Sequence, residues 1–325
     1  MQRLMSGMRP TGALHLGNWA GALANWVTLQ RSFACYFMVA DWHALTTGYE
    51  DTSGLEESTA EMVMDWLSLG LDPEAAVIFR QSMVKAHAEL YLLFAMVTPL
   101  GWLERVPTYK EQLRELAERE VATYGFLGYP VLQAADILAY RAEVVPVGQD
   151  QSSHVELTRE IARRFNHVFG TALPEPEARL TPSPVLLGTD GRKMSKSYGN
   201  TITFRDSAQE VTAKVRGMVT DPARVRRTDP GTPEVCPVFA LHRIYNPEGA
   251  EEIARGCRTA ALGCVACKAM LAERLNAALE PVRERRFALT ARPGLVEEVL
   301  AAGSARAAAE AEVTLGALRA AVGVR

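Results

Sequence analysis

The stretch RLMSGMRPTGALHLGNWAGAL, residues 3–23, joins a short apolar run to a helix-like segment through a loop of small residues. His15 and Asn18 stand three residues apart in that loop, where the helix-like pattern begins. Backbone N–H groups at a helix N-terminus attract anions, phosphate above all, and the imidazole and the amide could donate to the same oxygens. The pattern alone is equally typical of an ordinary strand-to-helix turn, so the rest of the chain has to decide.

The order of apolar run, loop and helix-like segment recurs through the first 200 residues. Short apolar runs predict buried strands at 3–7, 35–41, 75–82 and 143–149. Longer segments predict helices at 17–31, 52–69, 86–97, 130–140 and 152–168, with Pro130 in a first turn. Alternating strands and helices indicate an α/β fold with a parallel sheet covered on both faces, in which ligands bind at the carboxyl ends of the strands.

Strand signals end near residue 204, and the rest of the chain reads as helices, with an alanine-rich, helix-favouring tail from residue 300. We therefore expect two domains, 1–204 with the sheet and 205–325 made of helices. Residues 205–286 carry 14 Lys and Arg against 11 Asp and Glu. This mild basic bias fits a surface that faces nucleic acid, and it fits an ordinary solvated helical surface equally well.

Composition indicates a globular protein. The 325 residues are 48% hydrophobic, which is enough for one large or two medium domains with a real core. The N-terminus lacks an apolar export signal, and the longest apolar run, 90–97, is far shorter than the ~18 residues of a membrane helix. We expect a cytoplasmic protein with no membrane partner. Five cysteines in such a chain argue against a disulfide framework, and Cys35 is expected in the core.

A second glycine-flanked loop carries two lysines. It reads GTDGRKMSKSYGN, residues 188–200, and contains Lys193 and Lys196. Lysines on a glycine-hinged loop can close over a polyphosphate and neutralise the charge that develops as it leaves. A solvated basic loop is the alternative for a lone lysine pair, but the string from Lys193 to Ser197 is far more specific than a pair.

The two loops together resemble the signatures of the class I aminoacyl-tRNA synthetases, a His-x-Gly-His-like loop and a Lys-Met-Ser-Lys-Ser loop, with Asn18 in place of the second histidine. Nearly the whole chain resembles the tryptophanyl-tRNA synthetases of that class, through SGMRPTGALHLGNWAGAL, DWHALT, LERV, YPVLQAADILAY and VPVGQDQSSHVELTREIARRFN. The resemblance implies a Rossmann-like catalytic domain closing with the loop at 193–197. It also implies a helical domain that meets the anticodon, a C-terminal helix that packs back on the catalytic domain, and a homodimer.

The resemblance implies a reaction that needs no protein nucleophile. The carboxylate of L-tryptophan attacks the α-phosphate of ATP, pyrophosphate leaves with Mg²⁺ bridging the phosphates, and a hydroxyl of tRNA(Trp) then attacks the adenylate. Positioning and charge stabilisation carry such catalysis, and the resemblance assigns these roles to His15, Asn18, Lys193 and Lys196. It assigns ATP binding to Arg9, Pro10, Thr11, Gly17, Asn18, Gly148, Gln149, Asp150, Leu186, Lys193, Met194, Ser195, Lys196 and Ser197.

Three positions depart from the commoner pattern of that family. Arg9 stands where glutamine is usual, Gln112 replaces a frequent second lysine after Lys110, and Gln149 replaces a glutamate. Arg9 adds a fixed positive charge beside the phosphates or the carboxylate.

A helix face suggests the amino-acid site. Tyr129, Gln133 and Asp136 follow at i, i+4 and i+7, so that all three can point into one pocket. The resemblance makes Asp136 the acceptor for the indole N–H; a satisfied helix carboxylate is the structural alternative. It also implies a wider set of substrate residues, with apolar walls, an amino-group site and a histidine near the ring: Met5, Val145 and Val147; Tyr129 and Gln151; His43. A bonded core histidine is the alternative for His43.

Four cysteines cluster late in the chain. Cys236, Cys257, Cys264 and Cys267 are separated by 20, 6 and 2 residues, a spacing typical of a ligand set for zinc or an iron–sulfur cluster. Unconnected core cysteines are the alternative. A subset of tryptophanyl-tRNA synthetases carries a [4Fe-4S] cluster on a very similar pattern, and this resemblance favours the cluster over zinc. Such a site would pin helices near the anticodon, with Arg255, Arg258 and Lys268 available to the RNA.

The favoured interpretation is a tryptophan–tRNA ligase. The tyrosyl enzyme shares the Tyr-x3-Gln-x2-Asp face, although the stretch at 145–162 favours tryptophan. A paralogue that binds tRNA or senses redox state, with weak catalysis, is the remaining alternative, because of Arg9 and the cysteines.

Overall fold

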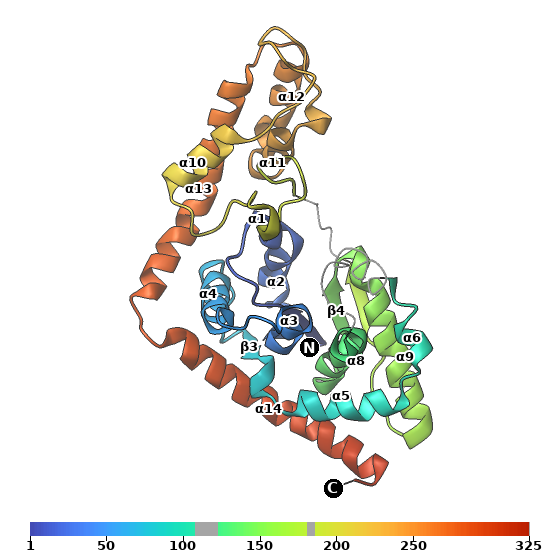
Figure 1. The fold of residues 1–325 in the computed structure, drawn as a ribbon. Helices are drawn as coiled ribbons and strands as arrows, with labels where there is room; N and C mark the ends of the chain where they lie inside the picture. The colour runs from blue at the N-terminus through green and yellow to red at the C-terminus, as the bar shows by residue number, and fades with distance from the viewer. Residues whose placement is uncertain (108–122, 181–185, 325) are drawn as a thin grey trace. The chain divides into compact units, whose positions relative to one another are not determined.

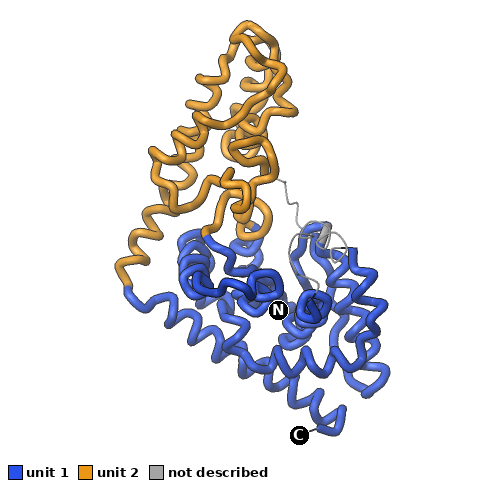
Figure 2. The backbone as a smooth tube through the Cα atoms, in the orientation of Figure 1, with its two compact units in different colours: residues 1–12, 25–182, 293–325 blue, residues 13–24, 183–292 orange. Residues whose placement is uncertain are grey.

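The computed structural model describes residues 1–107, 123–180 and 186–324 (Figure 1). These residues form two compact units, each assembled from separate stretches of chain (Figure 2). Unit 1 contains residues 1–12, 25–182 and 293–325, and unit 2 contains residues 13–24 and 183–292. The glycine-rich loop around His15 therefore belongs to the same unit as the lysine loop. The predicted division into two domains at residue 204, where the strand signals of the sequence end, stays a prediction.

Unit 1 contains a five-stranded, all-parallel sheet in the order β3-β2-β1-β4-β5. Its strands are β1 (Arg3–Met8), β2 (Ala34–Val39), β3 (Ala76–Arg80), β4 (Val144–Val147) and β5 (Glu177–Leu180). The first four confirm the predicted strands and the α/β fold. The sequence did not predict β5, because all four of its residues are exposed at the sheet edge and form no apolar run.

The sheet is covered by helices on both faces, as the alternating pattern predicts. The helices of unit 1 are α2 (Ala24–Leu29), whose first residue belongs to unit 2, α3 (Asp41–Gly48), α4 (Leu55–Ser68), α5 (Ala86–Val97), α6 (Leu100–Leu103), α8 (Tyr124–Ala139), α9 (Ser152–Phe169) and α14 (Leu295–Val322). Helix α3 was not predicted, because its eight residues directly follow a strand and carry a weak apolar pattern. The segment 17–31, predicted as one helix, is split into α1 (Leu16–Asn18), a π-helical turn (Trp19–Leu23) and α2.

Helix α8 starts earlier than the sequence predicts. Thr123 caps it, because the Thr123 side chain accepts a hydrogen bond from the backbone N–H of Phe126. The prediction that Pro130 lies in a first turn was wrong: Pro130 lies inside α8, six residues after its start at Tyr124. Proline has no N–H to donate, so the carbonyl of Phe126 lacks its usual helical partner.

The C-terminal helix α14 packs against β3 and α5 in unit 1. Gly303 makes this contact possible, since a Cβ at this position would lie 1.8 Å from the carbonyl oxygen of Ile78. Ser304 Oγ accepts a hydrogen bond from the backbone N–H of Arg80, at the end of β3. The helix therefore closes directly on sheet backbone.

Unit 2 is helical in its described residues after 204, as predicted. It contains α10 (Ala208–Gly217), α11 (Pro237–Tyr245), α12 (Ala250–Arg258) and α13 (Cys264–Thr290), and both α10 and α11 pack on α13. A capping box starts α10: Ser207 and Glu210 each accept from the other's backbone N–H. Among the described residues, none of the helices is both long and apolar enough to cross a membrane.

Candidate active site

The order of the strands marks where unit 1 would bind a ligand. Strand order reverses between β1 and β4, which are neighbours in the sheet, and ligands of such sheets bind beyond the carboxyl ends of the strands at this point. The loop after β1 begins with Arg9, whose Nη1 lies 3.4 Å from Thr47 Oγ1 on α3. Pro10 and Thr11 follow, and Gly148 to Gln151 follow β4. The predicted residue Gln112, Lys110 beside it and the side chain of Asp150 lie outside the described part of the structure.

Unit 1 also contains a buried carboxylate. Asp136 on α8 is 2% exposed, and three side chains contact its two oxygens. Gln81 Nε2 donates to Oδ1 at 2.8 Å, His87 Nδ1 lies 2.5 Å from Oδ1, and His43 Nε2 lies 2.7 Å from Oδ2. Burial by itself raises the pKa of Asp136, but the interactions with His43 and His87 outweigh it and lower the pKa to about 2. Asp136 is therefore ionised at neutral pH.

Gln81 links the carboxylate to the start of α3. Its Oε1 lies 3.1 Å from the backbone N of Trp42 and 3.4 Å from that of His43, both in the first turn of the helix. Because these groups donate, they fix the oxygen end of the amide, and the Nε2 end must face Asp136. The carboxylate therefore receives a donor whose orientation is set by backbone.

Most of the other predicted amino-acid-binding residues of unit 1 lie on α8 and on the strands. Tyr129 Oη lies 2.9 Å from His154 Nε2 on α9, and the His43 ring stands edge-on to Tyr129 with centroids 6.3 Å apart. Gln133 is half-buried. Leu4 pairs with Val144, so the next residues along the two strands, Met5 and Val145, lie side by side and both are in the apolar core. Val147 packs against the same core.

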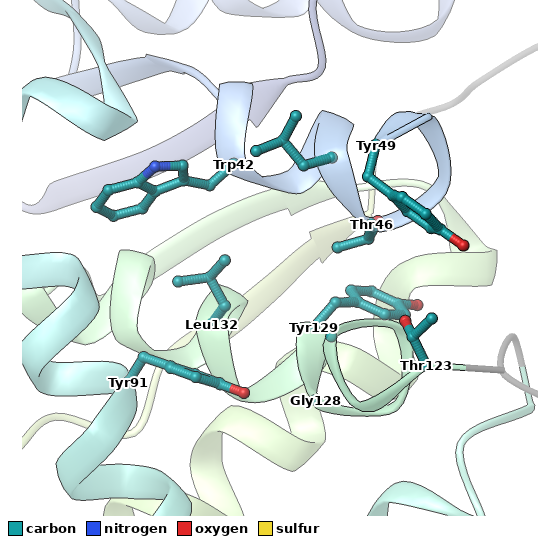
Figure 3. A pocket seen from close by; sticks show the side chains of 10 residues that line it. Trp42, Thr46, Tyr49, Tyr91, Thr123, Gly128, Tyr129 and Leu132 are labelled. Atoms are coloured by element: carbon teal, nitrogen blue, oxygen red, sulfur yellow. The ribbon is translucent and has the colours of Figure 1, made fainter. Parts of the chain in front are cut away.

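A cavity of about 410 Å³ opens between α3, α5 and α8 (Figure 3). Its described lining consists mostly of aromatic and apolar side chains and glycines: Trp42, Leu45, Thr46, Tyr49, Tyr91, Thr123, Gly125, Gly128, Tyr129 and Leu132. Tyr129 is thus both a predicted substrate residue and part of this wall.

In unit 2, the loop around His15 differs from the prediction of open backbone donors. The first four backbone N–H groups of the helical segment are all bonded within the protein: Leu16 to the Ile202 carbonyl, Gly17 to His15 Nδ1, and Asn18 and Trp19 to the His15 carbonyl. Asn18 Oδ1 in turn accepts from the backbone N–H of His15 at 3.0 Å. An anion would therefore meet side chains at this turn rather than free backbone N–H groups, which corrects the expectation.

The same hydrogen bonds fix the proton of His15. Its Nδ1 accepts from Gly17 N–H at 3.1 Å, so the neutral ring carries its proton on Nε2. Burial lowers the pKa of His15 to about 4, and the positive charge of Lys196 adds to this effect. Gly17 is required here, because a Cβ at this position would lie 2.9 Å from the imidazole. His15 is a neutral Nε2–H donor at physiological pH.

The lysine loop is held by Asn200, which the sequence did not single out. Asn200 is 1% exposed; its Oδ1 accepts from the backbone N–H of Ser195, and its Nδ2 donates to Lys193 O and Asp190 Oδ1. Met194 is buried and its N–H bonds to the carbonyl of Leu186. Lys193 is exposed and Lys196 half-buried. An asparagine at the end of the predicted loop 188–200 was the available signal.

The four late cysteines come together in unit 2. All four line one small cavity, with Arg224 beside them. Burial raises the pKa of the Cys267 thiol to about 12, and the neighbouring thiols of Cys236, Cys257 and Cys264 contribute to this rise. No group of three His, Cys, Asp or Glu side chains in the described ranges is arranged to hold a metal ion.

Of the three cationic residues expected to face RNA, Lys268 has a different role. Its Nζ donates to the carbonyls of Arg216 and Met218, at the C-terminal end of α10. Arg258 forms an exposed ion pair with Glu234, and Arg255 is exposed. Two of the three donors of the Lys268 ammonium group are therefore used within unit 2, and its availability to RNA stays a prediction.

Strand order and loops together define the class of protein. A parallel sheet in the order 3-2-1-4-5, with candidate ligand loops at the switch point, is the Rossmann-type α/β fold of nucleotide-binding proteins. Residues 1–280 match the family described as tRNA synthetases class I (W and Y). The chain belongs to this family.

Relatives of known name cover almost the full chain. It is 52% identical to a tryptophan–tRNA ligase of Thermotoga maritima and 45% identical to that of Aquifex aeolicus, with 98% of each chain covered in both cases. Among solved structures, it is similar to a tryptophanyl-tRNA synthetase of Campylobacter jejuni, solved in complex with ADP and tryptophan. That match has a TM-score of 0.88 and 34% identity, and covers 99% of this chain and 100% of the other.

Proposed function

We propose that this protein is a tryptophan–tRNA ligase. It joins L-tryptophan to the α-phosphate of ATP, releases pyrophosphate, and transfers the tryptophanyl group to a hydroxyl of tRNA(Trp). The observation that carries the proposal is the end-to-end similarity to proteins of that name, at 45–52% identity.

Amino-acid selection is the task of Asp136. An ionised, buried carboxylate is a strong acceptor for an indole N–H, and a side chain without that N–H would leave the carboxylate under-bonded in a buried site. Tyr129 and Gln151 bind the α-amino group, His43 lies between Asp136 and Tyr129, and Met5, Val145 and Val147 form the apolar wall.

The side chains around ATP bind it and stabilise charge, and none of them acts as a nucleophile. The Nε2–H of His15 and the amide of Asn18 donate to phosphate oxygens, and Lys193 and Lys196 neutralise the charge of the departing pyrophosphate. Mg²⁺ arrives with ATP as part of the substrate and bridges its phosphates. The remaining contacts are proposed at Arg9, Pro10, Thr11, Gly17, Gly148, Gln149, Asp150, Leu186, Met194, Ser195 and Ser197.

Tryptophan-dependent exchange of pyrophosphate into ATP tests the proposal. We expect exchange with tryptophan and a fall of about 100-fold or more in kcat for Lys196→Ala, because a preorganised charge acts in the transition state. Exchange with tyrosine instead would show the tyrosyl enzyme. Binding of tRNA without exchange for any amino acid would show a binding paralogue, the alternative that Arg9 and the cysteines motivate.

We further propose that the four cysteines hold a [4Fe-4S] cluster, with zinc as the alternative. The shared cavity of Cys236, Cys257, Cys264 and Cys267 supports this, as does Gly231, where a Cβ would lie 2.6 Å from Cys257 Sγ. A bound metal group would stabilise unit 2, because its ligand set does not exist in the unfolded chain.

Iron content and visible absorbance of protein purified without oxygen, beside the Cys264→Ser variant, test the metal proposal. About four irons per chain and a brown colour lost in the variant are expected. A colourless protein with zinc would replace the cluster by the alternative, and a metal-free protein would return these cysteines to the core. The homodimer, also proposed from the family resemblance, is checked by light scattering.

A further inference from the structure

The two carboxylate oxygens of Asp136 have different numbers of hydrogen-bond partners. An ionised carboxylate offers about four acceptor sites on its two oxygens. In the described structure Oδ1 meets two donors, Gln81 and His87, whereas Oδ2 meets one, His43. Among the described residues, Oδ2 therefore has one hydrogen-bond partner where it can accept two.

His87 is buried together with its second hydrogen-bond partner, Tyr140. It is 0% exposed on α5, and its Nε2 lies 2.6 Å from Tyr140 Oη while its Nδ1 faces Asp136. Since ionised Asp136 can only accept, the proton of His87 sits on Nδ1. Its Nε2 is then the acceptor for the hydroxyl of Tyr140.

Tyr140 is well placed to keep that arrangement. Its ring is buried and stacked on Tyr36, with centroids 4.5 Å apart, and it meets Phe79 edge-on. Burial raises the pKa of Tyr140 well above its ordinary value, and the negative charge of Asp136 adds to this. The phenol therefore keeps its proton and donates a hydrogen bond to His87 Nε2. This bond fixes the tautomer of His87.

We infer that His87 and Tyr140 form a buried positioning pair for substrate selection, which ties down Oδ1 of Asp136 and leaves one acceptor site of Oδ2 for the indole N–H of tryptophan. This inference rests on the proposed function. Neither side chain needs to touch the substrate: His87 acts through Asp136, and Tyr140 acts through His87. Without His87 and Tyr140, the carboxylate of Asp136 can rotate. The acceptor site of Oδ2 that would bind the substrate then turns toward protein groups.

The experiment compares L-tryptophan with L-3-benzothienylalanine, in which sulfur replaces the indole N–H, by pyrophosphate exchange with the full chain. For His87→Leu we expect kcat/KM for tryptophan to fall about 10-fold or more, mostly through KM, because a hydrogen bond to a charged group is weakened. The value for the sulfur analogue should stay within about 2-fold, since it never makes that bond. Selectivity for tryptophan falls by the same factor.

Two further variants test the two hydrogen bonds separately. His87→Asn keeps an N–H donor near the position of Nδ1 and should recover most of the selectivity. Tyr140→Phe removes only the hydroxyl and should reduce selectivity by about 3-fold. Phe94→Leu is the matched control, because Phe94 is equally buried on the same helix and packs on Phe165 instead of Asp136; its selectivity should not change.

Equal losses for both substrates in His87→Leu would show a merely structural role and overturn the inference, as would no loss at all. If His87→Leu does not fold, Tyr140→Phe decides, and unchanged selectivity in that variant overturns the inference. Wild-type protein is assayed first: absence of tryptophan exchange there refutes the proposed function itself, and the inference fails with it, whereas selective exchange followed by unaltered variants refutes the inference alone.

Discussion

His15 shows how neighbouring groups set the chemistry of one residue. Its identity follows from the sequence motif, but its protonation state depends on the Gly17 N–H that occupies Nδ1 and on burial beside Lys196. A neutral ring with its proton on Nε2 can donate a hydrogen bond to phosphate without taking up a further proton near neutral pH.

Acid should weaken the fold through His15. With a pKa of about 4 in the folded chain and about 6.5 when unfolded, the residue takes up a proton only in the unfolded chain between these values. Stability is therefore lost as pH falls from about 6.5 to about 4. His15→Asn keeps an acceptor for Gly17 N–H and removes the titration, so its urea midpoint should drop less between pH 7 and pH 5 than that of the wild type. Equal drops would contradict the assignment.

Asp136 illustrates the limit of residue-scale prediction. The spacing along α8 identified the carboxylate as a candidate, but Gln81 and His87 lie 55 and 49 residues away in the sequence. No local pattern marks a glutamine after a strand or a histidine near the start of a helix as its partners.

At the scale of elements, α14 depends on one glycine. The carbonyl of Ile78 in β3 occupies the place where a side chain of residue 303 would stand. The alanine-rich pattern correctly predicted a helix here, yet the sheet contact that makes Gly303 necessary depends on a strand more than 200 residues earlier.

Two alanine substitutions on α14 should have opposite effects. Gly303→Ala should destabilise the protein by about 1–3 kcal/mol, because overpacking against backbone forces the helix away from the strand. Gly316→Ala is the matched control: a Cβ there meets nothing within 4 Å, so the better helix propensity of alanine should leave stability equal or up to about 1 kcal/mol higher. Thermal unfolding of both variants measures the difference, and a neutral Gly303→Ala would refute the close contact.

At the scale of the whole molecule, amino-acid activation and RNA charging should respond to different residues. Arg255 is an exposed cation of unit 2, whereas Lys268 binds the end of α10 within that unit. An exposed cation can neutralise phosphate and give binding its dependence on salt.

Arg255→Gln should therefore raise KM for tRNA(Trp) about 3-fold at low salt and less at high salt, with pyrophosphate exchange unchanged. Lys268→Gln should instead lower the unfolding temperature, because two helix-end carbonyls lose their donor. Aminoacylation kinetics at two salt concentrations, together with melting curves, separate the effects. A salt-independent change in Arg255→Gln would show that Arg255 makes no phosphate contact.

The sequence by itself determined the first four strands and most of the helices between them, the parallel sheet, and the two signature loops with His15 and Lys193 to Ser197. These features are written in local patterns, namely apolar runs, helical periodicity and motif spacing. Tertiary structure decided that the His15 loop and the lysine loop belong to one unit, that backbone donors at the first turn are already used, that β5 pairs at the edge, and that Gln81, His87 and Tyr140 surround Asp136. Such pairings join groups far apart along the chain, and only closure of the chain around a buried charge selects which polar groups must meet to stabilise it.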